Sequence, residues 1–266
     1  AETALKLADA LRIDATLIGQ LGRRYQISLA CQAIRDLCRT MPTEPPVRDR
    51  FDRMLTGLDD LEFLTLLVDR ERLLASEWLF EQMATGRIDI FMSLSGRPSR
   101  DKAPALWTIW SAYVRWPLRP LFQLDHAASR HYLLELRRLS KRPSWEIAAA
   151  LDIDVPRYYP VTRVLAPTEK AMKRMVSLPA ELRLTRTVLA LMEFKQHTGA
   201  WPENLAIVGC DTLLDPFTGK PLIYRLGDRG PVVYSIGANL KDDRGSDEND
   251  VTGQSKDIVW RYFPGT

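Results

Sequence analysis

Cysteine is scarce in this chain, and its scarcity excludes several kinds of site. Cys31, Cys38 and Cys210 are the only cysteines, too few and too scattered for a disulfide framework or a four-ligand zinc site. On one helix Cys31 and Cys38 would share a face but stand about 10 Å apart, which is too far for a disulfide. We therefore expect this pair to be buried as small hydrophobic residues rather than to act in redox chemistry.

Long apolar runs are also missing. No stretch approaches the roughly 18 apolar residues that read as a membrane-spanning helix, and there is no signal peptide. The chain begins with Ala rather than Met, so it is either processed or a fragment. That start leaves room for a targeting or anchoring segment upstream of Ala1.

Strong charge of one sign is absent as well. The net charge is +3 and the basic residues alternate with acidic ones, so no clustered basic face for nucleic acid is expected. An apolar content of 45% is ample for the core of one large domain or two modest ones.

Familiar catalytic patterns are lacking too. There is no G-x-S-x-G elbow, no S-x-x-K and no Cys–His signature, and "TGK" at 218–220 lacks the first glycine of a phosphate loop. His126 and His131 would point about 140° apart on a helix, which does not suit shared metal ligation. In "LWTIWSAYVRW" (106–116), Trp107 and Trp110 fit a core or a partner contact better than a carbohydrate platform.

The apolar residues that are present recur mainly at helical spacing. They predict helices over 14–39, 58–86, 105–115, 119–141 and 143–151, with "MPTEPP" (41–46) as a break and 86–104 as a long loop. The proline-containing stretch 152–167 then reads as a connector.

The remaining segment changes character. It predicts a helix over 179–199, with Pro179 in its first turn and Gly199 as its stop, followed by strands at 221–226, 231–236 and 257–263. In "DPFTGKP" we expect Asp215 to cap a turn and Gly219 to take the left-handed position. The predicted fold class is α+β, mainly α: an all-helical domain (1–167), then an α/β module (168–266) in which one helix packs on a small three-stranded antiparallel sheet.

Carboxylates are crowded between the last two predicted strands, in "SIGANLKDDRGSDENDVTGQSKDIVW" (235–260). Three interpretations are open: a solvated acidic loop, a site for a hard cation, or a catalytic carboxylate cluster. Like charges so close together repel one another and raise one another's pKa, and a divalent cation reverses that effect. Lys241, Arg244 and Lys256 offer partial compensation without a metal. No register of the loop matches an EF-hand.

Roughly the last 80 residues carry an ordered series of motifs: a helix followed by "GAWP", then "DPFTGKPLIY", a strand that ends in "SIG", and an acidic loop that closes with "DI". This series resembles the C-terminal module of the major pseudopilins of type II secretion. The resemblance implies that a calcium ion holds the loop to the sheet. Carried over position by position, it assigns as ligands Asn239, Asp243, Asp247, Asp250 and Asp257.

The sequence departs from the pseudopilins in its first 165 residues. A pseudopilin begins with a hydrophobic helix that runs straight into this module, whereas here polar helices come first, so a filament subunit is not expected. The whole chain, including "DRERLLASEWLFEQM" (69–83), is similar to a group of uncharacterised bacterial envelope proteins that carry such an ending after a membrane anchor. That resemblance implies an extracytoplasmic location on the periplasmic side, with anchoring at the inner membrane.

These observations lead to one functional hypothesis and one alternative. The first is a non-enzymatic envelope protein whose helical body contacts a protein partner, through 86–104 and the Trp-rich helix, and whose module binds Ca²⁺. The alternative is a hydrolase or ligand-binding enzyme with a cleft between body and module. Such a cleft should bring titratable groups such as Glu193, His197 or Asp211 within reach of groups from the body.

Overall fold

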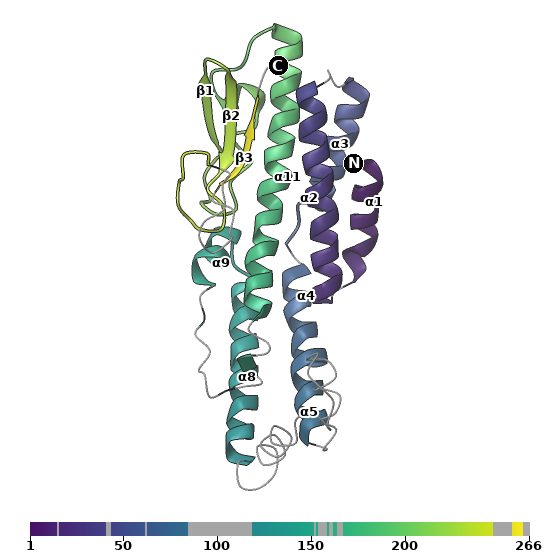
Figure 1. Ribbon diagram of the computed structural model, residues 1–266, viewed down its shortest axis with the longest axis vertical. Helices are drawn as coiled ribbons and strands as arrows, with labels where there is room; N and C mark the ends of the chain where they lie inside the picture. The colour runs from purple at the N-terminus through teal and green to yellow at the C-terminus, as the bar shows by residue number, and fades with distance from the viewer. Residues whose placement is uncertain are drawn as a thin grey trace, which may run out of the picture. The chain divides into compact units, whose positions relative to one another are not determined.

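The computed structural model describes residues 1–14, 16–40, 44–61, 63–84, 119–151, 153, 159, 162–163, 167–246 and 257–262. The protein is mainly helical and carries a three-stranded antiparallel sheet, so the predicted α+β class is confirmed (Figure 1). It forms two compact units. The first unit comprises Ala1–Phe63, Arg142–Leu151 and Ala171–Thr266, and the second comprises Leu64–Lys141 and Asp152–Lys170.

The helices of the first unit come from three parts of the chain. They are α1 (Glu2–Ala10), η1 (Leu11–Ile13), α2 (Leu17–Thr40), α3 (Pro45–Leu58), α9 (Ser144–Ala150), η4 (Leu205–Val208) and, from Ala171 onward, α11 (Pro167–Thr198). The last two residues of the predicted break "MPTEPP", Pro45 and Pro46, occupy the first turn of α3. Proline is well accommodated there, since the first helical N–H groups have no intrahelical partner.

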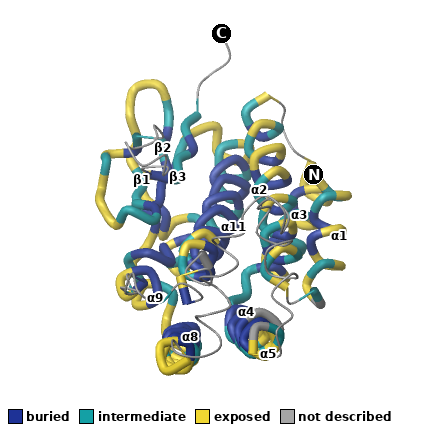
Figure 2. Tube along the Cα trace, turned by 60° about the horizontal axis from the view of Figure 1, so that its bottom comes forward, coloured by how far each residue is buried: buried dark blue, intermediate teal, exposed yellow. Residues whose placement is uncertain are grey.

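Helix α11 begins earlier than the sequence indicates. Pro179, predicted in the first turn, lies inside the helix, which starts at Pro167. An interior proline removes one backbone hydrogen bond. Around it, however, Met175, Val176 and Leu182 are fully buried, and Figure 2 shows α11 dark blue through its middle. Packing on several sides therefore outweighs the local signal of the proline. The predicted stop is confirmed, because Gly199 follows the helix with a φ of 76°.

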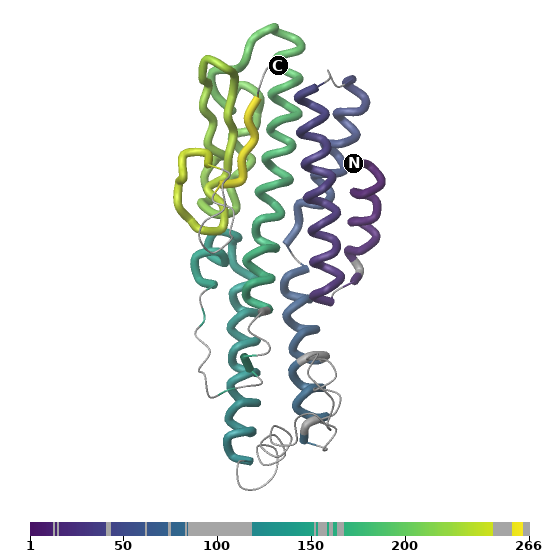
Figure 3. Tube along the Cα trace, viewed as in Figure 1, coloured from purple at the N-terminus to yellow at the C-terminus, as the bar shows by residue number. Residues whose placement is uncertain are grey.

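The sheet is a simple meander of β1 (Ile223–Gly227), β2 (Gly230–Ser235) and β3 (Ile258–Arg261). Tyr234 pairs with Ile223 on one side and with Val259 on the other. The strands agree with the predicted ones to within about two residues at each end. Ser235 pairs with Ile258, so the acidic loop 236–257 starts and ends on neighbouring strands. Figure 3 shows its described part at the end of the sheet opposite the β1–β2 turn.

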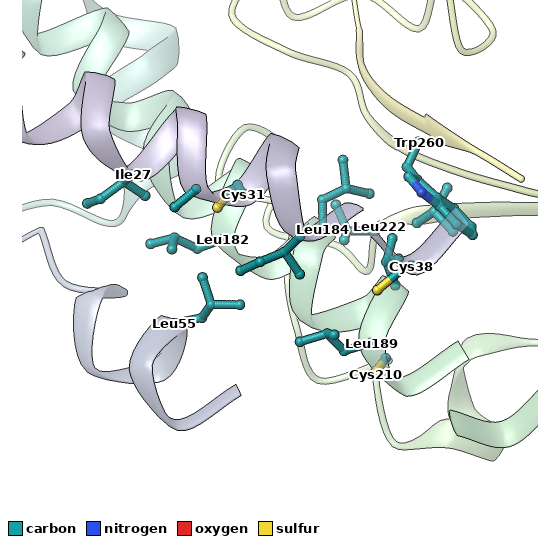
Figure 4. Packing of buried hydrophobic residues seen from close by; sticks show 14 of the residues in the cluster. Ile27, Cys31, Cys38, Leu55, Leu182, Leu184, Leu189, Cys210, Leu222 and Trp260 are labelled. Carbon is teal, nitrogen blue, oxygen red and sulfur yellow. The ribbon is translucent and has the colours of Figure 1, made fainter. Parts of the chain in front are cut away.

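One hydrophobic core holds the first unit together. In Figure 1, α11 lies between the sheet on one side and α1, α2 and α3 on the other. Figure 4 shows this core, in which Cys31 and Leu55 from the first helices share one cluster with Leu182, Leu222 and Trp260. Cys31 and Cys38 are buried, as predicted, and are not joined in a disulfide. The core therefore joins residues from both sides of the boundary predicted after residue 167.

The second unit contains nearly all of α4 (Phe63–Arg70), together with a π-helical segment η2 (Glu71–Glu77), α5 (Trp78–Ala84) and α8 (Arg119–Leu139). The helix predicted over 58–86 is thus present from 63 to 84, with a π-helical middle. Segments 86–104 and 105–115 lie outside the described residues. Among the helices that are described, none combines the length and the hydropathy that crossing a bilayer requires.

Candidate metal site in the acidic loop

The start of the acidic loop is fixed by Asp215, in the turn that precedes β1. Asp215 is 1% exposed, and its Oδ1 accepts hydrogen bonds from the Ser235 hydroxyl at 2.8 Å and from the Phe217 N–H at 2.9 Å. Its Oδ2 accepts the N–H of Ile236 at 3.2 Å. Asp215 therefore caps its own turn, as predicted, and also holds the last residue of β2 and the first residue of the loop.

The turn itself depends on a glycine. The N–H of Gly219 donates to the Asp215 carbonyl at 2.9 Å, and Gly219 has a φ of 68°. This left-handed conformation is the one predicted for Gly219, and glycine adopts it at little cost because it lacks a Cβ. A Cβ added at Gly219 would lie 2.9 Å from Cδ2 of Trp145 in α9. The turn therefore packs closely against Trp145 of α9.

The end of the loop is fixed by Asp257, the residue before β3. This side chain is 1% exposed. Its Oδ2 accepts the N–H of Gly245 at 2.6 Å, and its Oδ1 accepts the N–H of Asp243 at 3.4 Å. The backbone N–H of Asp257 donates to the Ser246 carbonyl at 2.9 Å. One buried carboxylate therefore ties residues 243–246 to the last strand.

Residues 243–246 form a tight turn that presents these N–H groups. The N–H of Ser246 donates to the Asp243 carbonyl at 3.2 Å. The two central residues, Arg244 and Gly245, have φ values of 59° and 81°, and positive φ at both is the mark of a type I′ turn. The N–H groups of Asp243 and Gly245 point to the carboxylate of Asp257, while that of Arg244 donates to Asp242 Oδ1 at 2.8 Å.

The outer part of the loop is attached to the sheet through Asp242. The hydroxyl of Tyr234 donates to Asp242 Oδ1 at 3.0 Å, and Arg225 Nη2 lies 3.7 Å from Oδ2. Burial raises the pKa of Tyr234 to about 12, and the hydrogen bond to Asp242 acts in the same direction. Neither Asp215 nor Asp242 is among the predicted site residues. Asp215 is twenty residues from Ser235, so nothing in the local pattern indicates their contact.

The predicted ligands that the structure describes lie together. Asn239 Nδ2 donates to Asp243 Oδ2 at 2.7 Å, and the N–H of Asp243 points to Asp257. Asn239, Asp243 and Asp257 are therefore linked in one chain of hydrogen bonds. Asp247 and Asp250 lie outside the described residues.

Electrostatics at this place disfavour a bare carboxylate. Burial raises the pKa of Asp257, the N–H groups of Gly245 and Asp243 lower it in part, and the negative charges of Asp243 and Asp242 raise it further. Burial likewise raises the pKa of Asp215, against its hydrogen bonds from Phe217, Ser235 and Ile236. Both ends of the loop thus depend on a carboxylate whose ionised form is costly.

The chemistry of these side chains fits a hard cation. Asn239, Asp242, Asp243 and Asp257 carry oxygen ligands and neither sulfur nor imidazole, a set that suits Ca²⁺ and not zinc. Within the described ranges, no three Asp, Glu, His or Cys side chains come close enough to hold a metal ion. The described residues alone therefore do not make up a full set of ligands.

The residues named for an enzymatic cleft are only partly brought together. Glu193 Oε1 accepts a hydrogen bond from Arg48 Nη2 of α3 at 2.7 Å, as the enzymatic alternative requires. His197 and Asp211 are exposed and form no ion pair with another described residue.

No protein-family model, curated protein or solved structure matches the chain.

Proposed function

We propose that the protein is a non-enzymatic scaffold of the bacterial cell envelope, in which Ca²⁺ stabilises a C-terminal module of the pseudopilin type. The observation that carries this proposal is the convergence of Asn239, Asp243 and Asp257 at the end of a loop that buried carboxylates hold at both ends. In this proposal Asp247 and Asp250 complete the ligand set.

When bound, Ca²⁺ supplies two positive charges to a place where carboxylates raise one another's pKa. The chain's own residues position the loop. Asp215 holds its start, the type I′ turn at 243–246 presents N–H groups to Asp257, and Tyr234 and Arg225 hold Asp242 against the sheet. The metal would thus stabilise an arrangement that hydrogen bonds already define.

The proposed location agrees with this kind of site. Flexible oxygen-ligand sites outside the cytoplasm bind Ca²⁺ with dissociation constants of about 10⁻⁴–10⁻³ M. Such an affinity suits a structural ion that is always present in the surroundings of the protein. Inside a cell, where the concentration of free Ca²⁺ is kept far lower, a site of this affinity would stay empty.

The scaffold role is supported by one face of α2. Ile18, Tyr25 and Leu29 are 83%, 61% and 43% exposed, and their spacing of seven and four residues places them on one side of the helix. A row of large apolar side chains in solvent is typical of a contact surface. We assign to it an apolar helix of a partner protein, since a row at this spacing fits the packing of another helix.

Thermal melting tests the metal. The melting temperature is measured with EDTA and then with millimolar Ca²⁺ restored. A ligand that binds only the folded form at ten times its dissociation constant adds about 1.4 kcal/mol, or about 3–6 °C for a chain of this size. Asp257→Asn should reduce this shift. Asp228→Asn, at an exposed position in the β1–β2 turn, should leave it unchanged. Equal melting temperatures with EDTA and with Ca²⁺ would remove the metal from the proposal.

A photo-crosslinking residue at position 25 tests the scaffold role in cells. The adduct with a partner should disappear when Ile18 is changed to Asp, and a crosslinker at the exposed Arg229 should give none. An adduct at position 25 that persists in the Ile18→Asp variant would contradict the assignment of this face.

A further inference from the structure

A hollow of about 630 Å³ opens in the first unit between α3, α11 and the segment that follows η4. This volume lies within the range of small-molecule sites in proteins. Leu189 of α11 and Cys210, both drawn in Figure 4, belong to its lining and are 2% and 5% exposed. Charged side chains of both signs from α3 and α11 make up much of the remaining lining.

Arg48 is the most deeply placed of these charges. It is 4% exposed, and two of its nitrogens are used: Nη2 bonds Glu193 Oε1 at 2.7 Å, and Nη1 bonds Gln196 Oε1 at 3.2 Å. Its buried Nε has no partner in the described part of the chain. Because this N–H is buried, a ligand in the hollow does not reach it, and the donors open to a ligand belong to other arginines of the lining.

Two further arginines in the lining have uncommitted donors. Arg186 bonds Asp52 Oδ1 at 2.7 Å through Nε alone, and Arg53 bonds the Asp49 carbonyl at 3.3 Å, also through Nε. Among the described residues, the terminal nitrogens of both make no hydrogen bond. A guanidinium with its fork exposed is well suited to a carboxylate.

Acidic side chains complete the lining. Asp49 is exposed and forms no ion pair with another described residue, and Glu193 engages Arg48 through only one of its two oxygens. These negative charges would repel a ligand that carries several phosphates. They would attract an ammonium group next to the position that the arginines offer to a carboxylate.

We propose that this hollow binds a small zwitterion of the amino-acid or short-peptide class. The ligand's carboxylate bonds the terminal nitrogens of Arg53 and Arg186, its ammonium group faces Asp49 and Glu193, and its apolar part lies over Leu189 and Cys210. The proposal is independent of the metal and of the scaffold role, because none of these residues belongs to the acidic loop or to the exposed face of α2.

Titration calorimetry with three probes, carried out on the whole chain in EDTA, tests the proposal. The probes are trialanine with free ends, N-acetyl-trialanine, which lacks the ammonium group, and trialanine amide, which lacks the carboxylate. Free trialanine should bind. Each blocked form should bind about tenfold more weakly or worse, since each loses charge-assisted hydrogen bonds. No binding of free trialanine at millimolar concentration, or equal binding of all three probes, would overturn the proposal.

Two exposed positions on α3 separate the roles without disturbing the core. Arg53→Gln should weaken free trialanine and N-acetyl-trialanine but not the amide, and Asp49→Asn should weaken free trialanine and the amide but not the acetylated form. Asp228→Asn and Arg229→Gln, both exposed in the β1–β2 turn, are the matched controls. If Arg53→Gln and Asp49→Asn bind all three probes as the unchanged protein does, the hollow is not the site.

Discussion

At the scale of single residues, two buried carboxylates hold the two ends of the acidic loop in place. Asp215 and Asp257 are each 1% exposed and accept backbone N–H groups from the two ends of the loop 236–257. Burial raises the pKa of both. Their hydrogen bonds therefore come with an electrostatic cost, and that cost makes the stability of the module depend on pH.

The sign of this dependence at Asp257 can be predicted. Because its pKa is higher in the folded state, the folded protein binds more protons than the unfolded chain between the unfolded value near 3.8 and the raised value. In EDTA its contribution to the free energy of unfolding should therefore be lost as the pH rises through this window. Urea unfolding of the unchanged protein and of Asp257→Asn, from pH 3.5 to 7, measures it.

The difference between these two proteins should thus shrink with rising pH in EDTA. With Ca²⁺ it should grow instead, because the metal binds the ionised carboxylate. The comparison cancels other acids, such as Glu77, whose pKa is lowered by its hydrogen bond to Arg130. A difference that stays constant with pH in EDTA would show that Asp257 does not titrate abnormally.

A second prediction at this scale concerns Gly219. Gly219→Ala should destabilise the protein through its φ of 68° and through contact with Trp145. Gly209→Ala is the control, because Gly209 has the same φ and no atom lies within 4 Å of its added Cβ. We expect about 1–2 kcal/mol for Gly209→Ala and more for Gly219→Ala. Chemical denaturation measures both. In a Trp145→Ala background the two costs should become equal, and a persistent excess would contradict a clash.

At the scale of elements, the sequence predicts what depends on local periodicity. Helix α8 and the three strands lie close to their predicted bounds. Their helical and alternating patterns depend on residues only two to four positions apart, which the sequence shows directly. The predicted start of α11 is wrong. Pro179 resembles a first-turn proline, but the buried packing around it stabilises a helix that continues on both sides of this residue. Helix α3 is not predicted, because the prolines of "MPTEPP" indicate a break, whereas Pro45 and Pro46 form the first turn of this helix.

Arg183 shows how one side chain joins three elements. Its Nε and Nη2 bond the two carboxylate oxygens of Asp59, after the end of α3, at 2.8 and 3.1 Å. Its Nη1 bonds the Leu214 carbonyl at 2.7 Å, next to the turn that carries Asp215. Lysine cannot reproduce this planar fork. Arg183→Lys should lower the free energy of unfolding by about 1–3 kcal/mol, measured by denaturation. Arg174→Lys, exposed on the same helix, should change little.

At the scale of the whole molecule, the candidate sites depend on contacts between distant parts of the chain. The predicted ligands Asn239, Asp243 and Asp257 are named from the resemblance to the pseudopilins, whose motifs all lie within one stretch of sequence. The contact between Asp215 and Ser235 could not be predicted, because it joins residues twenty apart in the sequence. The hollow around Arg48 arises only when α3 and α11, more than a hundred residues apart in the sequence, pack together, and only the participation of Glu193 could be predicted.

The same packing predicts the behaviour of the C-terminal module when isolated. In the first unit, Ile27, Ile34 and Leu55 share a core with Leu182 and Trp260, so a fragment of residues 168–266 would expose the face of α11 that α2 and α3 cover. Exposure of that much apolar surface removes a large part of the folding free energy. We expect the fragment to melt without cooperativity and to bind a hydrophobic dye, with or without Ca²⁺, while the whole chain melts cooperatively. Circular dichroism and dye fluorescence on both proteins test this. A cooperative transition in the fragment would mean that the module folds independently, as in a pseudopilin, and that the N-terminal helices only cover it.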